Sequence, residues 1–220
     1  MAFPGMDCST YPGDARMQEL KRQTNLAWTG FYLAPAPNHP DTDWMDRRAV
    51  LAAQGWGFAP TYLGHQQQHL TNAQGKVDGA DAAQLAHAAH FEPGTVVYLD
   101  VEQGPPLGDP MKTYYASWVQ SVVDAGYTPG IYCSFLNVAD FIATDHRPKV
   151  WTWRLILPEG DAVNPPYRTD SPSGSSYAGA RMWQYVQNMK TVFAPAAGAP
   201  PITMHPIDFS TSSVSDPSVP

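Results

Sequence analysis

The sequence predicts an α/β protein folded as a single (β/α)8 TIM barrel, with long irregular loops in its last third. Two observations favour this fold: apolar strand-like segments alternate with segments of helical periodicity, and eight such strands fit within 220 residues. A composition of 43% apolar and 12% aromatic residues is sufficient for one large core. We place one barrel domain over residues 1–210 and expect a disordered tail over residues 211–220, where Ser, Pro and Val follow no pattern.

Four strands are predicted in the first half of the chain. Each is a short apolar run followed by a turn signal, such as the Pro35-Ala36-Pro37 that closes the second strand. The helices between them begin at N-cap residues or carry apolar side chains on one side, as Met17 and Leu20 do. The predicted strands end at Asp7 or cover residues 30–34, 57–63 and 95–102, and the predicted helices cover 13–24, 41–55 and 78–91.

The second half continues this alternation until its loops lengthen. Tyr114, Trp118 and Val122 lie at helical spacing, and Gly126 suits the end of that helix. Two stretches rich in Pro, Gly, Ala or Ser predict long loops in place of helices. The predicted helices cover residues 110–125 and 135–144, the strands 129–133, 150–155, 181–186 and 206–209, and the loops 158–180 and 193–201.

Charge and hydropathy argue against several kinds of partner. Only 15% of the residues are charged, the net charge is −7 and no run of like charges occurs, which argues against nucleic acid and anionic membranes as partners. No stretch of eighteen apolar residues could span a bilayer, so we expect a soluble protein, and we expect a monomer. No secretory signal is visible in residues 1–7. This leaves open a cytoplasmic protein, export without a cleavable signal, or a signal removed beforehand.

The cysteines and histidines predict no metal or cofactor site. Cys8 and Cys133 fall on the first and fifth predicted strands, on opposite sides of a barrel, so we expect two buried free thiols. His65 and His69 have a spacing that could bind a metal from one helix face. Three glutamines separate them and no third ligand is near, so we favour a polar loop at the rim of the barrel.

The fourth predicted strand ends in two acidic residues, Asp100 and Glu102. Because side chains alternate along a strand, Tyr98, Asp100 and Glu102 share one face, with the α-carbons of the two acids roughly 6.5 Å apart. Carboxyl groups at such a separation are suited to cleaving glycosidic bonds. The alternative is that both are strand-end residues that meet water or a neighbouring arginine.

Asp7 and Asp208 end the first and eighth predicted strands, which brings four carboxylates to one rim of the barrel. Like charges repel, so the cluster destabilises the fold and raises the pKa of at least one member. A raised pKa is what a general acid working near neutral pH requires, while another carboxylate stays ionised. The carboxyl ends of the strands are also where barrel enzymes carry out their chemistry.

Two sets of short motifs resemble known families. Those of the first set occur in order from residue 3 to about 210, and they are Met6-Asp7-Cys8-Ser9, Tyr98-Leu99-Asp100-Val101-Glu102, Gly130-Ile131-Tyr132-Cys133-Ser134, Met182-Trp183-Gln184-Tyr185 and Ile207-Asp208-Phe209. They resemble glycoside hydrolase family 25, the N-acetylmuramidase lysozymes. Those of the second set are Tyr11-Pro12-Gly13-Asp14, Tyr32-Leu33-Ala34-Pro35-Ala36-Pro37 and Gln54-Gly55-Trp56-Gly57-Phe58-Ala59-Pro60. These resemble the Rv2525c-like glycoside hydrolase-like domains of unknown function, which share this barrel.

The resemblance implies a (β/α)8 barrel whose rim groove acts on or binds peptidoglycan-type glycan. Glu102 would be the proton donor, and Asp100 would support the N-acetyl group of the substrate as it assists cleavage. Asp7 and Asp208 would be the other two rim carboxylates. The end of the second strand departs from family 25, because residues 33–37 read Leu-Ala-Pro-Ala-Pro where a polar, acid-containing segment is usual. We expect this departure to affect substrate choice.

Ten further residues are candidates for binding the substrate. His65 and Gln66 follow the third strand and could hydrogen-bond sugar hydroxyls. Alternation along the sixth and seventh strands predicts that one tryptophan of each lines the barrel. Trp183 or Tyr185 is then either a stacking platform for a sugar ring or part of the core. The ten candidates are Tyr32, Tyr62, His65, Gln66, Tyr98, Tyr132, Trp153, Trp183, Gln184 and Tyr185.

Two classes of function remain open at this point. The first is a glycosidase that cleaves the β-1,4 bond after a muramic acid residue, with Glu102 as general acid and without a cofactor. The second is a barrel that binds cell-wall glycan or a protein partner without cleaving it. An enzyme that reaches the cell wall without a visible signal would take part in phage lysis or use a dedicated secretion machine. Secretion machinery and an immunity protein are therefore candidate partners.

Overall fold

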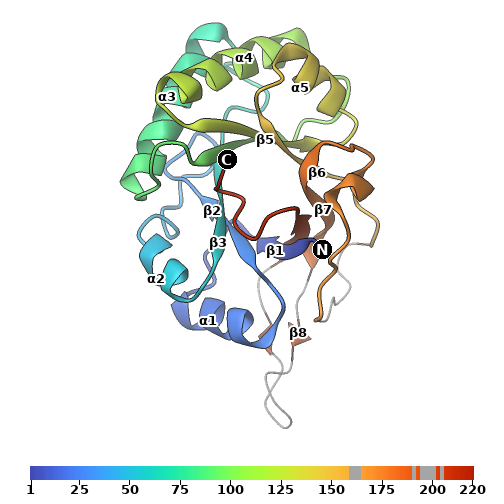
Figure 1. Ribbon diagram of the computed structural model, residues 1–220. Helices are drawn as coiled ribbons and strands as arrows, with labels where there is room; N and C mark the ends of the chain where they lie inside the picture. Colours follow the sequence, from blue (N-terminus) through green and yellow to red (C-terminus); the bar gives the residue numbers. More distant parts are fainter. Residues whose placement is uncertain (159–164, 190–191, 194–201, 204–205) are drawn as a thin grey trace.

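The computed structural model describes residues 1–158, 165–189, 192–193, 202–203 and 206–220. Strands and helices alternate through most of the chain, and Figure 1 shows the strands arranged in a ring. The strands are β1 (Phe3–Asp7), β2 (Trp28–Tyr32), β3 (Gly57–Leu63), β4 (Val96–Asp100), β5 (Thr128–Ser134), β6 (Lys149–Trp153), β7 (Ala180–Met189), β8 (Val192–Phe193), β9 (Ile202–Thr203) and β10 (Ile207–Ser212). The helices are α1 (Asp14–Gln23), α2 (Arg48–Ala53), α3 (Asn72–Ala88), α4 (Asp109–Asp124), α5 (Val138–Thr144) and the 3₁₀ helix η1 (Pro172–Ser175).

Eight strands close into a barrel in the order β1-β10-β7-β6-β5-β4-β3-β2, which confirms the predicted α/β barrel. Neighbouring strands from β1 to β7 pair in parallel. The parallel pairing of all eight strands that a (β/α)8 barrel implies does not extend to β10, which pairs antiparallel with both β1 and β7. A parallel return needs a long crossover to the opposite end of the barrel. Here the antiparallel pair β8–β9 lies between β7 and β10, so the chain re-enters the barrel from the rim at which β7 ends.

The helices cover only part of the outer surface of the barrel. Figure 1 shows α1 and α2 on one side and α3 to α5 on another, whereas extended chain and η1 lie outside β6 and β7. α3 begins at Asn72, ahead of the predicted start, because the hydroxyl of Thr71 caps it by accepting from the Gln74 N–H. α2 is shorter than predicted, since residues 43–46 form a turn. No helix in the described ranges is long and apolar enough to cross a bilayer.

Aromatic rings fill the barrel below its carboxyl rim. Trp151 meets Trp28 and Tyr98 edge to face, with ring centroids 5.6 and 5.9 Å apart. Two glycines make room for these rings, because a Cβ on Gly5 would lie 2.0 Å from the Trp28 ring and one on Gly130 would lie 2.4 Å from the Tyr98 ring. The rings occupy the space that a pore would take, so the interior of the barrel is a packed core below its carboxyl rim.

Residues 211–220 pack against the barrel, which corrects the expectation of a disordered tail. Thr211 and Ser212 belong to β10, and the chain then crosses the opening of the barrel in Figure 1. Asp216 Oδ1 accepts a hydrogen bond from the Phe58 N–H at 2.9 Å, and the Ser218 carbonyl accepts one from the Val96 N–H at 2.8 Å. The amino ends of β3 and β4 carry backbone donors that need acceptors, and the terminal segment supplies them.

Candidate active site

A pocket of about 330 Å³ opens at the rim where β1 and β4 end and β10 begins. The four predicted carboxylates, Asp7, Asp100, Glu102 and Asp208, all line this pocket. β10 runs antiparallel to β1, so the amino end of β10 lies at the rim where β1 ends. Asp208 is near that amino end and is the register partner of Asp7, and it therefore lies at the same rim as the other acids. The other lining residues are Cys8, Ser9, Thr10, Tyr32, Leu63, Asn188 and Pro206.

Asp7 and Asp100 are buried, with 5% and 6% of their surfaces exposed. Asp7 Oδ1 accepts a hydrogen bond of 3.1 Å from the Tyr32 hydroxyl, while Asp7 Oδ2 and Asp100 Oδ1 have no partner among the described residues. Burial raises the pKa of both carboxyl groups well above the usual range. The next largest cause is the charge of Asp208 for Asp7 and that of Glu102 for Asp100. The pocket therefore holds two carboxyl groups that keep a proton more readily than ordinary aspartates do.

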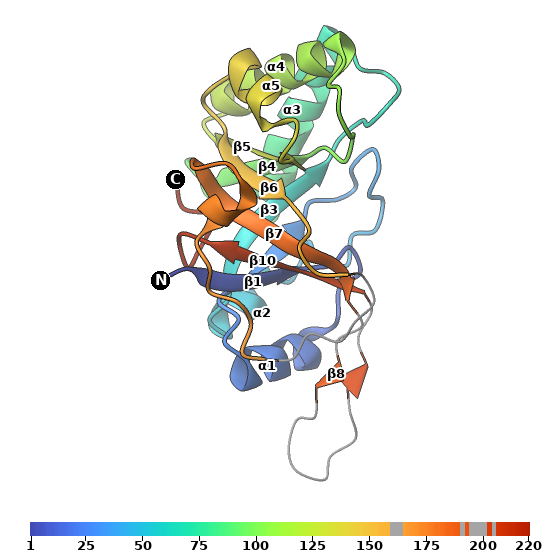
Figure 2. The same cartoon turned by 90° about the vertical axis from the view of Figure 1, so that its right-hand side faces the viewer.

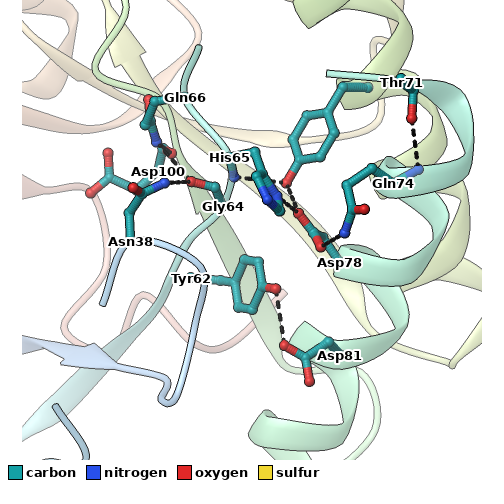
Figure 3. A network of polar contacts seen from close by, with 11 residues as sticks. Asn38, Tyr62, Gly64, His65, Gln66, Thr71, Gln74, Asp78, Asp81 and Asp100 are labelled. Atoms are coloured by element: carbon teal, nitrogen blue, oxygen red, sulfur yellow. Dashed lines mark hydrogen bonds and ion pairs between the residues drawn. The ribbon is translucent and has the colours of Figure 1, made fainter. Parts of the chain in front are cut away.

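Gln66 fixes the backbone that carries the two acids of the D-x-E segment. Its Nε2 donates to the Asp100 carbonyl at 2.7 Å, as Figure 3 shows, and its Oε1 accepts from the Glu102 N–H at 3.0 Å. The sequence predicts that Gln66 contacts sugar hydroxyls, but both of its amide atoms are engaged with this backbone. Gln66 therefore positions the acids, and the Glu102 side chain stays exposed at the pocket.

Asp208 is held by two donors from β7. Gln184 Nε2 donates to its Oδ2 at 3.0 Å, and the Asn188 N–H donates to its Oδ1 at 2.7 Å. Gln184 is fully buried, so the predicted contact with substrate is replaced by a contact that orients Asp208. Asn188 has a φ of 55° near an irregularity in the β7–β10 pairing. It lies beyond the predicted end of this strand at Val186, and no sequence signal marks it.

Three of the predicted aromatic residues remain near the acids. Tyr32 lines the pocket. Tyr132 is the register partner of Asp100, and part of its surface is exposed. Burial of its hydroxyl, together with the charge of Asp100, raises the pKa of that hydroxyl. Trp153 ends β6, is partly exposed and is the register partner of Gln184. These three rings remain candidates for contact with a glycan.

Trp183 and Tyr185 lie on the outer face of β7 and are excluded as a stacking platform by burial. Their exposed fractions are 4% and 0%. Trp183 Nε1 donates to the Arg154 carbonyl at 2.9 Å, and a Cβ on Gly174 would touch its ring at 2.6 Å. Because side chains alternate along a strand, Gln184 faces the interior and its two aromatic neighbours face outward. Of the two alternatives that the sequence leaves open, core packing is the one observed.

Tyr62 and Tyr98 are also fully buried and away from the pocket. Tyr62 points outward from β3, and its hydroxyl donates to Asp81 Oδ2 on α3 at 3.0 Å (Figure 3). Tyr98 faces the barrel interior, but its hydroxyl donates to the Pro217 carbonyl at the opposite end of the barrel, at 3.1 Å. Neither ring contributes to the acidic pocket.

His65 turns toward α3 and away from Asp100 in Figure 3. Its Nδ1 lies 2.7 Å from Oδ2 of the buried Asp78. The same carboxylate accepts from the Tyr114 hydroxyl at 2.5 Å and, through Oδ1, from Gln74 Nε2 at 2.7 Å. The predicted contact of His65 with sugar is thus replaced by one that ties the rim loop to α3.

Cys8 and Cys133 are buried free thiols, as predicted. Burial raises the pKa of both thiols, which makes them poor nucleophiles. Within the described ranges, no three or more His, Cys, Asp or Glu side chains are grouped so that they could hold a metal ion. The side chains of the pocket offer acid–base chemistry by carboxyl groups.

Comparisons with known proteins place this geometry in context. The family model described as "Rv2525c-like, glycoside hydrolase-like domain" matches residues 18–197. No curated protein matches the chain. An uncharacterized B. stearothermophilus protein has a similar structure, with a TM-score of 0.67 at 18% identity over 96% of each chain.

Two further solved structures have the same fold. The Tat-secreted protein Rv2525c of Mycobacterium tuberculosis, in complex with HEPES, has a TM-score of 0.61 at 13% identity, over 99% of this chain and 97% of that one. The bacterial lysozyme from Streptomyces coelicolor has a TM-score of 0.60 at 14% identity, over 97% of this chain and 93% of the lysozyme. The barrel is therefore shared by a lysozyme and by glycoside hydrolase-like proteins.

Proposed function

The chain belongs to the family of Rv2525c-like glycoside hydrolase-like domains, and from that premise we propose that it is an N-acetylmuramidase that cleaves the glycan of peptidoglycan. The observation that carries the proposal is the convergence of Asp7, Asp100, Glu102 and Asp208 in one pocket at the rim of the barrel. Four carboxyl groups in one place are costly to the fold unless their chemistry is used. Paired carboxyl groups are the usual means of glycoside hydrolysis.

Glu102 acts as the general acid. Its side chain is exposed at the pocket, where a glycosidic oxygen can reach it, and Gln66 fixes its backbone. Transfer of its proton to that oxygen allows the bond between the oxygen and C1 of the sugar to break. The Glu102 carboxylate then accepts a proton from the water that completes hydrolysis.

The acetamido group of the substrate supplies the nucleophile. Its carbonyl oxygen bonds to C1 as the leaving oxygen departs, and water later opens the resulting ring, so the configuration at C1 is retained. Asp100 orients the acetamido group from the buried side of the pocket. Asp208, which accepts hydrogen bonds from Gln184 and Asn188, stabilises the positive charge that develops on the sugar ring, and Asp7 faces it from β1.

A second function fits the same pocket, namely binding of cell-wall glycan without cleavage. The exposure of Glu102 favours it, because glycosidase acids are commonly tuned by burial in an apolar environment. A binding barrel would depend on the partly exposed rings of Tyr132 and Trp153 more than on Glu102.

Release of reducing ends from purified peptidoglycan distinguishes the two functions. We expect release by the intact protein and none above background by Glu102→Gln, because an amide is too weak an acid to transfer a proton to the leaving oxygen. Both proteins should still sediment with insoluble peptidoglycan. Glu92→Gln is the matched control, since Glu92 is exposed and precedes β4 at the opposite end of the barrel.

Three outcomes are informative. Release abolished only by Glu102→Gln supports the muramidase. Sedimentation without release, for the intact protein and both variants, supports the binding barrel. Neither release nor sedimentation contradicts both functions.

A further inference from the structure

A second hollow, of about 420 Å³, lies at the end of the barrel opposite the acidic pocket. Its walls include the first residues of β6 and β7 and Ser213, which follows β10. In Figure 2 both chain termini lie at this amino-terminal end, whereas the loops that follow β3 and β4 lie on the far side. The hollow therefore shares no wall with the pocket that holds the four carboxylates.

The hollow is positively charged in a protein that is negatively charged overall. Arg147, Lys149 and Arg181 line it together with His146, and none of the described lining residues is Asp or Glu. The whole chain has 13 Lys and Arg against 20 Asp and Glu. Cations gathered in one hollow repel one another, and an anion bound among them offsets that cost in free energy.

Two of these cations keep their charge available. Lys149 makes no ion pair with any residue that the structure describes. Arg181 Nη2 donates to the Val219 carbonyl, which is uncharged, and Arg181 Nε is buried without an acceptor in the described structure. A buried N–H of a charged group without an acceptor is unfavourable, so the protein does not engage every donor of Arg181.

Arg147 contributes oriented hydrogen-bond donors more than it contributes net positive charge. Asp145 holds it, with Arg147 Nη2 2.6 Å from Asp145 Oδ2 and Arg147 Nε 3.0 Å from Asp145 Oδ1, and Gln120 Oε1 accepts from Nη1 at 3.1 Å. The guanidinium is therefore fixed before any ligand arrives. Fixed guanidinium groups beside a lysine are suited to the several acceptor oxygens of a phosphate group.

We propose that this hollow is a binding site for a phosphate group, either as a free anion or as a phosphate ester on a sugar. Lys149 and Arg181 supply the opposing charge, and the oriented Arg147 supplies further donors. The volume exceeds that of a bare phosphate, and the partly exposed ring of Tyr177 on the wall offers an apolar surface to an attached group. The site is independent of the proposed glycosidase chemistry.

Isothermal titration calorimetry of the full chain tests the site, with inorganic phosphate and glucose 1-phosphate as separate probes. We expect Lys149→Gln to weaken binding of both probes about tenfold, as the loss of one charge-assisted contact predicts. Lys149→Arg should restore binding, and the matched control Lys76→Gln, an exposed lysine on α3, should leave it unchanged. Raising the NaCl concentration should weaken binding to the intact protein.

The two probes distinguish the sources of the phosphate. Tighter binding of glucose 1-phosphate indicates a sugar-borne phosphate, and equal or tighter binding of inorganic phosphate indicates the free anion. The proposal is overturned if neither probe binds the intact protein, or if Lys149→Gln and Lys76→Gln bind both probes equally well.

Discussion

The buried carboxyl group of Asp100 couples the stability of the barrel to pH. Because its pKa is raised in the folded state, the folded protein keeps a proton that the unfolded chain has already lost. The contribution of Asp100 to stability is therefore greatest at low pH. It falls as pH rises from the ordinary aspartate pKa to the raised folded value, by up to about 1.4 kcal/mol per pH unit.

Asp100→Asn should remove this dependence. We expect the variant to have a higher free energy of unfolding than the intact protein at pH 8 and a difference near zero at pH 4. Urea unfolding at the two pH values measures both quantities. Asp46→Asn, at an exposed position, should show no such pH-dependent gain. Equal pH dependence in the intact protein and Asp100→Asn would contradict the raised pKa.

Gln66 should affect turnover more than binding. Gln66→Ala frees the backbone of Asp100 and Glu102, so we expect kcat for reducing-end release to fall about tenfold or more, because small misplacements of reacting groups are costly. KM and sedimentation with peptidoglycan should change little. The neighbouring Gln67 is exposed, and Gln67→Ala is the matched control. A rise in KM at unchanged kcat would instead favour direct contact of Gln66 with the sugar.

The positions of the four acids could be predicted from sequence because each follows directly from the end of a strand. Contacts between side chains of different strands could not. Gln66 and Gln184 are expected to face the substrate, yet they bind the backbone of Glu102 and the carboxylate of Asp208. Trp183 shows the same limit. Alternation along a strand predicts that Trp183 and Gln184 lie on opposite faces, but it does not predict which of them faces the barrel interior.

At the scale of elements, two glycines decide how closely α3 and α4 pack. A Cβ on Gly75 would lie 2.3 Å from the Tyr114 carbonyl oxygen, and one on Gly79 would lie 2.6 Å from that of Trp118. Glycine weakens a helix, yet α3 includes both glycines and begins at Asn72, ahead of the predicted start at Asp78. The packing that compensates for this weakness is visible only in three dimensions.

Gly79→Ala should therefore destabilise the protein. Helix propensity alone would stabilise the variant by up to about 1 kcal/mol, but the clash with α4 should cost about 1–3 kcal/mol and should determine the sign. Thermal and urea unfolding give the change. Ala80→Gly, at the exposed neighbouring position, reports the propensity effect by itself. A stabilised Gly79→Ala variant would show that the two helices can separate at little cost.

At the scale of the whole molecule, closure of the barrel depends on how the last strand returns. The number of strands and the meeting of Asp7 with Asp208 could be predicted from the alternation of elements. The direction of β10 could not, because it depends on the path of the chain between β7 and β10. The packing of the terminal segment could not be predicted either, because its Ser, Pro and Val residues lack periodicity. Its contacts with the barrel are made by its backbone and by Asp216.

Asp216 secures this segment across the amino-terminal end of the barrel. Its Oδ1 accepts from the Phe58 N–H at 2.9 Å, the Ser218 N–H at 3.1 Å and the Ser218 hydroxyl at 2.7 Å. Asp216→Ala leaves the Phe58 donor without its acceptor, and we expect a loss of about 1–3 kcal/mol in the free energy of unfolding. Ser215→Ala, at an exposed position, should change it by less than about 0.5 kcal/mol. Faster hydrogen exchange at Phe58 and Val96 in Asp216→Ala alone would locate the loss at this end of the barrel, and unchanged exchange there would contradict the assignment.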